Sequence, residues 1–425
     1  MMHAPANTGS RYERHWRWFV LGTLFLATFL NYFDRQTLGT AIEPIARELG
    51  FDNARRGTLL AAFIYSYAAS HLFIGPVVDR VRSVRHFFPF MLLGWSASTM
   101  LVGLARDDSQ ILGLRVLLGI WESVNFPLCL LIIRRIFPPG ERSLASGIFA
   151  SGAFLATIAA PPMVIFLSTS FNWRFSFVFA GLLGLLWLIP WYSVFRKPEQ
   201  RSAGWAEAMA AREVIPASAF AAENYRAVLS APGFWVVALM GLGLIPSLYF
   251  ATQWFPSFFT QALGHPYDQT LAYRLSFVYL MQDAGLWGGG VLVLWLSRLG
   301  VSILTSRKLA IGLATVLILM IVPASRAASI NACVALFCCF TCGIGVFLGN
   351  QHAFKQDVDR RRVGTVAALV GAIETGFTAF VVQRVGVVLH DNADFTPVFL
   401  TLGGLATFAC AVAMFLVRPR WFKIE

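Results

Sequence analysis

Apolar residues divide the chain into long hydrophobic segments that alternate with short polar connections. A helix of about 20 mainly apolar residues can cross a hydrocarbon layer of about 30 Å. The pattern predicts twelve such segments, at residues 16–40, 55–79, 87–105, 111–134, 143–168, 174–195, 232–260, 273–297, 307–323, 330–352, 363–386 and 395–417. The sequence therefore predicts an all-α membrane protein with twelve transmembrane helices embedded in a lipid bilayer.

The longest polar stretch separates the twelve segments into two sets of six. We predict an N-terminal six-helix bundle at 1–195, a cytoplasmic central loop at 196–231 and a C-terminal six-helix bundle at 232–425. The sixth and twelfth segments end in similar stretches, "VFRKPE" and "LVRPRW". Matching exits of this kind are typical of transporters built from two related halves.

The basic character of the chain follows from its predicted topology. The formal net charge is +12, but 24 of the 34 Lys and Arg residues fall in the termini and connections on one side of the membrane. This bias follows the positive-inside rule and predicts both termini in the cytoplasm, in an inner or plasma membrane. It also explains the charge without a nucleic-acid partner. The six cysteines all lie in apolar segments without nearby His or carboxylate ligands, so neither a metal site nor a disulfide is predicted.

Some predicted helices contain ionisable residues, which are costly in a membrane and are therefore candidates for function. Insertion of Asp or Arg at a helix centre costs about 2.5–3.5 kcal/mol. Asp34 and Arg35 lie in the first segment, and Arg115 and Glu122 lie in the fourth. The last two share one helix face but lie about 10 Å apart, so each needs a partner from elsewhere. We predict that Asp34 and Arg35 supply these partners.

Two interpretations of these four charges are open. They could form a structural ion-pair network that holds the first and fourth helices together. They could instead form a transport site, in which the arginines bind a substrate carboxylate and the desolvated acids carry protons. An apolar pair would serve packing equally well, so four convergent charges favour the transport site.

Several motifs together carry a family resemblance. They are "NYFDR" (31–35), "RVLLGIWESVNFP" (115–127), "ERSLASGIFASGA" (141–153), "FNWRFSFVFAGLLGLLW" (171–187), "FRKPE" (195–199) and "DAGLWGGG" (283–290). In order and spacing they resemble the anion:cation symporters of the major facilitator superfamily, most closely the bacterial hexuronate and sugar-acid branch. The resemblance covers most of the chain.

The resemblance implies proton-coupled uptake of a small organic anion, a hexuronate- or hexonate-type sugar acid or a related carboxylate, by alternating access. It implies no cofactor beyond the proton gradient, and we expect a monomer. It assigns proton coupling to Asp34 and Glu122. The substrate-binding candidates are Tyr32, Arg35, Arg115 and Asn125 in the first half and Tyr249, Gln253, Asn350, Gln351 and Glu374 in the second. The gating candidates are Asp79, Arg80 and Asp283.

The chain departs from the family pattern in ways that bear on the substrate. Arg82 replaces a glycine in the loop after the second helix, and residues 152–155 have no polar side chain where an amide is common. Glu374 stands where an amide is common. We expect Glu374 either to pair with Arg384 or His352, or to favour a substrate with a cationic or hydroxyl-rich end.

Other classes of function remain open at this point. A proton-driven antiporter that exports metabolites or drugs would use the same acids, although two buried arginines disfavour cationic drugs. A sensor for sugar acids would normally carry an appended signalling domain, for which the tails and the central stretch are short. An enzyme is not indicated, because no Ser-His-Asp order, metal cluster or nucleotide-binding loop appears.

Overall fold

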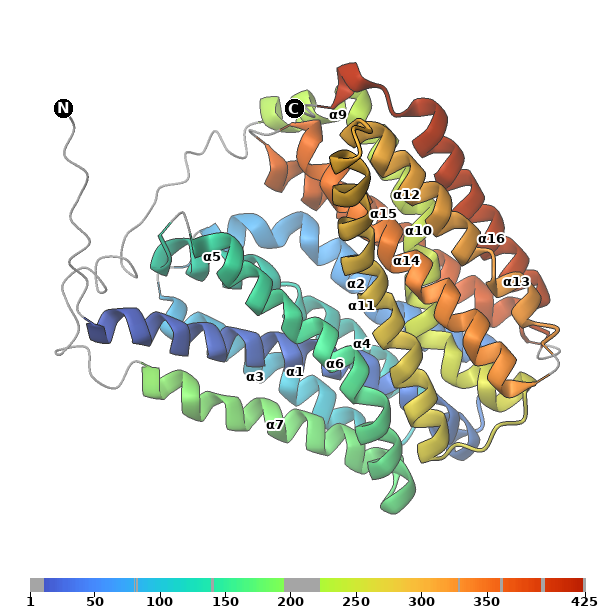
Figure 1. The fold of residues 1–425 in the computed structure, drawn as a ribbon. Coiled ribbons are helices and arrows are strands. Elements are labelled where there is room, and N and C mark those ends of the chain that lie inside the picture. The colour runs from blue at the N-terminus through green and yellow to red at the C-terminus, as the bar shows by residue number, and fades with distance from the viewer. Residues whose placement is uncertain are drawn as a thin grey trace.

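The computed structural model consists of α-helices joined by short connections (Figure 1). It describes residues 11–79, 81, 83–138, 141–194, 222–327, 329–359, 362–390 and 394–422. The helical segments of the first half are α1 (Arg11–Leu49), α2 (Asn53–Asp79), α3 (Val84–Val102), α4 (Asp108–Glu122) followed by α5 (Asn125–Ile136), α6 (Arg142–Ser170) and α7 (Trp173–Val194). Those of the second half are α9 (Ala222–Leu229), α10 (Pro232–Ser257) continued by the π-helical turn η4 (Phe258–Ala262), α11 (Gln269–Arg298), α12 (Ile303–Ile318) followed by α13 (Ile321–Ala324), α14 (Ile330–Val358), α15 (Val363–Val388), and α16 (Thr396–Ala411) continued by η5 (Val412–Leu416) and η6 (Pro419–Trp421).

The predicted all-α fold of twelve long helical segments is confirmed. Ten of the segments are long and apolar enough to cross a membrane. The other two are α1, which carries charges along its length, and α3, which has Arg85 and His86 in its first turn. Both pack within the first half, α1 against α6 and α7 and α3 against α4 and α7. The chain is therefore a multi-pass membrane protein.

The helices form two groups that correspond to the two halves of the sequence (Figure 1). In the first, α1 packs against α6 and α2 packs against α4; in the second, α14 packs against α11 and α12 while α10 packs against α15 and α16. Residue 195 and residues 196–221 of the predicted central loop lie outside the described residues, and α9 follows them. The exact domain boundaries stay a prediction.

The two halves meet where α2 crosses α15. Gly57 of α2 faces Gly386 of α15, and a Cβ atom on Gly57 would lie 2.7 Å from the carbonyl oxygen of Gln383. A Cβ atom on Gly386 would in turn collide with the carbonyl oxygen of Asn53. Only residues without a side chain allow the two backbones to approach this closely.

A polar network reinforces this contact between the halves. Asn53 Nδ2 donates to the Leu389 carbonyl at 2.9 Å and to Gln261 Oε1 at 3.1 Å. Gln261 Nε2 donates in turn to Glu43 Oε2 at 3.2 Å, and the same oxygen accepts from Arg56 Nη1 at 2.5 Å. The network thus connects α1 and α2 with η4 and the end of α15.

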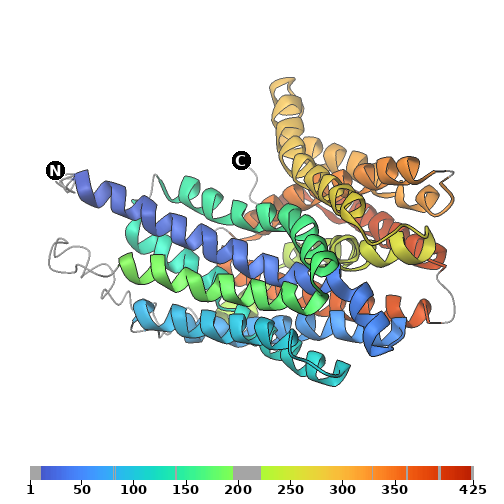
Figure 2. The same cartoon turned by 90° about the horizontal axis from the view of Figure 1, so that it is seen from below.

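The contacts between the halves lie at the end of the molecule opposite the chain termini. Among the described residues, the hydrogen bonds and ion pairs that join the halves involve residues 43–65, 158–162, 261–276 and 383–390. Toward the termini the two groups of helices diverge in both views (Figures 1 and 2). The described polar contacts thus hold the halves together at the end opposite the termini.

The glycine contact leads to a testable expectation. Gly386→Ala should weaken the contact between the halves, because overpacking a close contact costs about 1–3 kcal/mol. Hydrogen exchange of the amides at the start of α2 should become about tenfold faster. Gly371→Ala on the same helix is the matched control, since a Cβ atom there meets no other atom within 4 Å. Equal exchange in the two variants would contradict the role of the glycine contact.

Candidate functional site

Four charged side chains gather between α1 and α4. Arg35 Nε donates to Glu122 Oε2 at 2.7 Å, and the two residues are 7% and 0% exposed. Asp34 interacts electrostatically with both of them and with Arg115. The predicted pairing between the first and fourth spans is confirmed for Arg35 with Glu122, while the functional roles of these residues stay predictions.

The guanidinium group of Arg35 is enclosed by aromatic rings. It lies 4.5 Å from the ring centre of Tyr32 and 4.3 Å from that of Tyr67. Aromatic rings at these distances favour a cation at this position. Glu122 accepts from Nε, so this carboxylate does not use the two terminal nitrogens of Arg35.

Arg115 and Glu122 also have unused hydrogen-bonding atoms. Nε and Nη2 of Arg115 and Oε1 of Glu122 are buried and have no partner among the described residues. The Arg115 guanidinium lies 4.8 Å from the ring centre of Phe63. Buried charged groups are normally saturated with hydrogen bonds when their role is structural. The unused atoms therefore favour a binding site over a structural network.

The fourth predicted span is interrupted directly beside Glu122. α4 ends at Glu122 and α5 begins at Asn125. Pro127 has no amide hydrogen, so the carbonyl of Ser123 loses its helical donor. Asn125 Nδ2 donates to Thr28 Oγ1 at 3.2 Å, which ties the interruption to α1. Asn125 is thus engaged inside the first half, and its predicted contact with substrate stays a prediction.

The substrate-binding candidates on α10 and α14 differ from one another in what they contact. Tyr249 interacts electrostatically with Arg35 in the first half and with Glu374 in the second. Gln253 lies against Gly39 of α1, and its buried Oε1 has no donor among the described residues. Asn350 Nδ2 donates to the carbonyl of Val346 in its own helix at 2.9 Å.

Glu374 has a partner that the sequence did not predict. Lys355 Nζ donates to Glu374 Oε1 at 2.6 Å, and Gln351 Nε2 donates to Glu374 Oε2 at 3.1 Å. The predicted pairing with Arg384 or His352 is therefore wrong. The physical reason is that α14 continues to Val358, so that Lys355 turns inward instead of lying in a solvated connection.

The three gating candidates are only partly described. Asp283 lies on α11, is 8% exposed, and has no hydrogen bond or ion pair among the described residues. The side chain of Asp79 and all of Arg80 lie outside the described residues. The gating role of the three residues stays a prediction.

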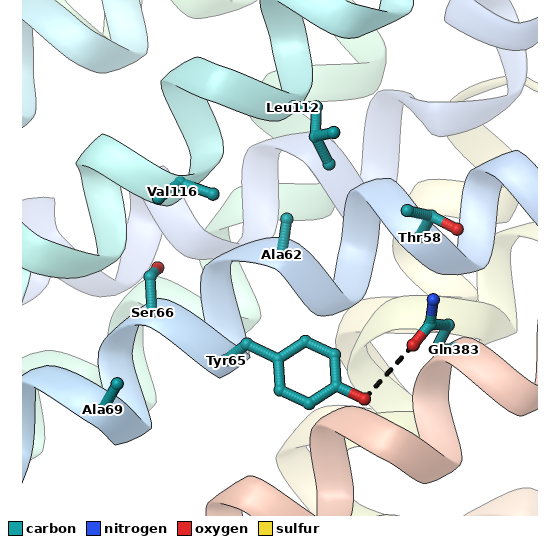
Figure 3. A pocket seen from close by; sticks show the side chains of 8 residues that line it. All are labelled: Thr58, Ala62, Tyr65, Ser66, Ala69, Leu112, Val116 and Gln383. Atoms are coloured by element: carbon teal, nitrogen blue, oxygen red, sulfur yellow. Dashed lines mark hydrogen bonds between the residues drawn. The ribbon is translucent and has the colours of Figure 1, made fainter.

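A groove of about 410 Å³ lies on a different face of α2 from the charged cluster. In Figure 3, the hydroxyl of Tyr65 points across this groove and donates to Gln383 of α15 at 3.2 Å. Tyr67, in contrast, contacts Arg35. The groove is lined by Thr58, Ala62, Tyr65, Ser66, Ala69, Leu112, Val116 and Gln383, without an ionisable acid or base. We therefore place the candidate site at the charges and not in this groove.

Sequence reasoning missed Tyr67 and Lys355. Tyr67 belongs to a series with Phe63 and His71, which are spaced four residues apart and stack on one another. Such spacing places them on one helix face, which is a signal available in the sequence. Lys355 follows Gln351 by one helical turn, but it lay beyond the predicted end of the span.

The sequence matches the profile described as "Major Facilitator Superfamily" over residues 24–382. It is 28% identical to the hexuronate transporter of Bacillus subtilis (strain 168) over 416 residues, which cover 93% of each chain. It is also 28% identical to the D-galactonate transporter of Escherichia coli O6:H1 over 275 residues, or 62% of this chain and 63% of that protein.

Solved structures share the fold. One is a bacterial homolog of the human lysosomal transporter Spinster in an inward-facing and occupied conformation. It superposes with a TM-score of 0.70 at 20% identity and covers 94% of both chains.

Proposed function

Because the chain belongs to the Major Facilitator Superfamily, we propose that this secondary transporter takes up a sugar acid of the hexuronate or hexonate type, or a related carboxylate, together with protons. The protein is a transporter and not an enzyme, as are its relatives and fold neighbours. We place it in the inner or plasma membrane as a monomer without a cofactor.

The observation that carries the proposal is the buried guanidinium fork of Arg35. Glu122 accepts from Nε and not from the terminal nitrogens, and the aromatic rings of Tyr32 and Tyr67 contact the guanidinium group. A planar fork with two donors matches a carboxylate, which can accept both hydrogen bonds. The unused donors of Arg115 lie in the same charged cluster.

In the proposed mechanism, Asp34 and Glu122 couple the transport of substrate to the transport of protons. When Asp34 and Glu122 carry protons, they no longer compete for the arginines, and a substrate carboxylate can take their place. When a proton leaves on the cytoplasmic side, the carboxylate of Glu122 recovers Arg35 and the substrate is released. Binding of proton and of substrate therefore support each other, as symport requires.

The proposed direction of transport rests on the topology that the uneven distribution of Lys and Arg residues predicts. Most Lys and Arg residues lie on the side of the termini, which we therefore place in the cytoplasm. The helices of the two halves diverge toward this side, which supports release of substrate into the cytoplasm.

Uptake into proteoliposomes tests the proposal. Vesicles with a more acidic exterior should accumulate radiolabelled D-galactonate or a hexuronate, and a protonophore should abolish the accumulation. A proton-driven exporter predicts the opposite, since an outward-directed substrate flux would follow an inward proton flux. If neither a sugar acid nor a related carboxylate accumulates, the proposal fails.

A further inference from the structure

The last described segment of the chain carries basic and aromatic residues directly after a membrane span. This span, formed by α16 and η5, ends at Leu416, and Arg418, Arg420 and Trp421 follow it. Phe415, at the end of the span, is 78% exposed. Cations and a tryptophan at the end of an apolar span are typical of the boundary between hydrocarbon and water. The pattern therefore indicates that this segment lies at the level of the lipid headgroups.

Two arginines lie beside the ring of Trp421. The Cζ atoms of Arg418 and Arg420 lie 5.2 and 5.5 Å from its ring centre. Both arginines are exposed, and neither forms a salt bridge among the described residues. Because a guanidinium group presents several donors in one plane, two of them beside one ring can bind the oxygens of a single phosphate group.

A third cation lies at the same end of the span. Lys308 Nζ of α12 donates to the carbonyl of Met414 at 2.8 Å. In an α-helix this carbonyl would accept from the amide of Arg418, but Arg418 has extended backbone angles, with φ −116° and ψ 139°. An ammonium group has three donors, and the bond to Met414 uses one of them. Lys308 thus caps the end of the span and adds a positive charge there.

The segment that carries the two arginines is packed against the helices beside it. Phe422 is 4% exposed, and its ring centre lies 5.1 Å from that of Phe354 on α14. A Cβ atom on Gly233, at the start of α10, would lie 2.9 Å from the carbonyl oxygen of Trp421. The backbone is therefore held in place, so a ligand of the arginines would not have to order it first.

The acid nearest to this packing contact already has a partner. Asp357 of α14 pairs with Arg307 at 2.5 Å, and the guanidinium of Arg307 lies 5.2 Å from the ring centre of Phe354. This pair leaves the charges of Arg418 and Arg420 without compensation from Asp357. The segment therefore has an excess of positive charge, which favours an anionic ligand.

We infer that this segment and Lys308 form a binding site for the headgroup of an anionic phospholipid. The phosphate group contacts Arg418 and Arg420, and the acyl chains lie along the exposed side chains of Phe415 and Leu416. α16, which leads to this segment, lies at the outer edge of the second group of helices (Figure 1). A soluble phosphate would contact only the cations, whereas a phospholipid also covers the apolar surface beside them.

Dioleoyl-phosphatidylglycerol and dioleoyl-phosphatidylcholine are matched probes for this site, because they have the same acyl chains and differ in the net charge of the headgroup. Native mass spectrometry of the purified protein measures the Kd of each lipid. Wild-type protein should bind phosphatidylglycerol about tenfold or more tightly than phosphatidylcholine. Arg418→Gln/Arg420→Gln should weaken binding of phosphatidylglycerol by about tenfold or more and change that of phosphatidylcholine by less than about twofold.

The matched control removes two other exposed arginines and so makes the same change in net charge. Arg106 precedes α4, and Arg298 ends α11. Arg106→Gln/Arg298→Gln should bind phosphatidylglycerol within about twofold of wild type, because charges outside the site act only through screened, long-range attraction. An equal loss of affinity in the two double variants would show attraction by overall charge and would overturn the inference.

Two further outcomes would also contradict the lipid site. Wild-type protein that binds phosphatidylcholine as tightly as phosphatidylglycerol does not recognise a negative headgroup. Displacement of phosphatidylglycerol by an equal concentration of soluble glycerol phosphate would show a site for a free anion, without a contribution from the acyl chains. Neither outcome bears on the proposed function, because uptake of sugar acids into proteoliposomes tests that function separately.

Discussion

Arg35→Lys is expected to lower sugar-acid uptake by about 100-fold or more. A hydrogen bond to a charged group contributes about 1.5–3 kcal/mol, and each 1.4 kcal/mol corresponds to about tenfold in affinity. Once Glu122 is protonated and no longer competes for Arg35, the two terminal nitrogens of the guanidinium can donate to both oxygens of a substrate carboxylate. Lysine has a single nitrogen in place of this fork and cannot lie flat between the rings of Tyr32 and Tyr67.

The measurement is initial uptake by proteoliposomes over a range of substrate concentrations. The Michaelis constant should rise, because the lost bonds hold the substrate carboxylate. Arg47→Lys is the matched control on the same helix, since Arg47 has a side chain that is 66% exposed and pairs with Glu43 instead of with Glu122. A Michaelis constant for Arg35→Lys equal to that of Arg47→Lys would show that Arg35 does not bind the substrate.

The sequence was sufficient to predict the fold and the first charged pair. Helices in a membrane must satisfy their own backbone hydrogen bonds, so long apolar segments leave few alternatives. Charges within such segments are costly, and this cost pointed to Arg35 and Glu122 before their contact was known. Both features depend on the local chemistry of the segment, which a sequence contains in full.

The second charged pair was harder to predict for a physical reason. A lysine near the end of a span can extend to the aqueous phase or turn into the bundle, and hydropathy alone does not distinguish the two. Lys355 turns inward because Glu374 from another helix accepts its charge. Likewise, Asn53 and Gln261 are 208 residues apart in the chain, and their hydrogen bond depends on how the two halves pack. Such contacts follow from tertiary structure and not from local pattern.

The position of Tyr67 was only partly predictable from the sequence. Aromatic residues at a spacing of four can face lipid, the protein interior or a ligand, and the spacing alone fits all three. The structure places Tyr67 against Arg35 and places Tyr65, two residues earlier, in a groove on a different face of α2. The sequence therefore indicates a row of aromatic residues on one face of α2. Only the neighbouring helix α1, which carries Arg35, determines what this row contacts.

Asp34→Asn is expected to abolish accumulation driven by a pH gradient while leaving exchange of substrate across the membrane. Asp34 is 2% exposed and interacts electrostatically with Glu122, Arg115 and Arg35. Asparagine is close in shape and polarity, but its amide neither gains nor loses a proton near neutral pH. The arginines stay available for the substrate carboxylate, so binding persists without its link to protonation.

Two assays on the same proteoliposomes separate these effects. In the first, an acidic exterior drives uptake, and accumulation by Asp34→Asn should fall to the level reached with a protonophore. In the second, vesicles loaded with unlabelled substrate exchange it for labelled substrate at equal pH, and the variant should retain at least about a tenth of the wild-type rate. Glu48→Gln is the matched control, because it makes the same change at the far end of α1, where Glu48 accepts from Trp173 Nε1 at 2.7 Å. If the Asp34→Asn variant still accumulates substrate against a gradient, another residue carries the coupling proton. Glu122 is then the first residue to test, because it is fully buried and its Oε1 has no partner among the described residues.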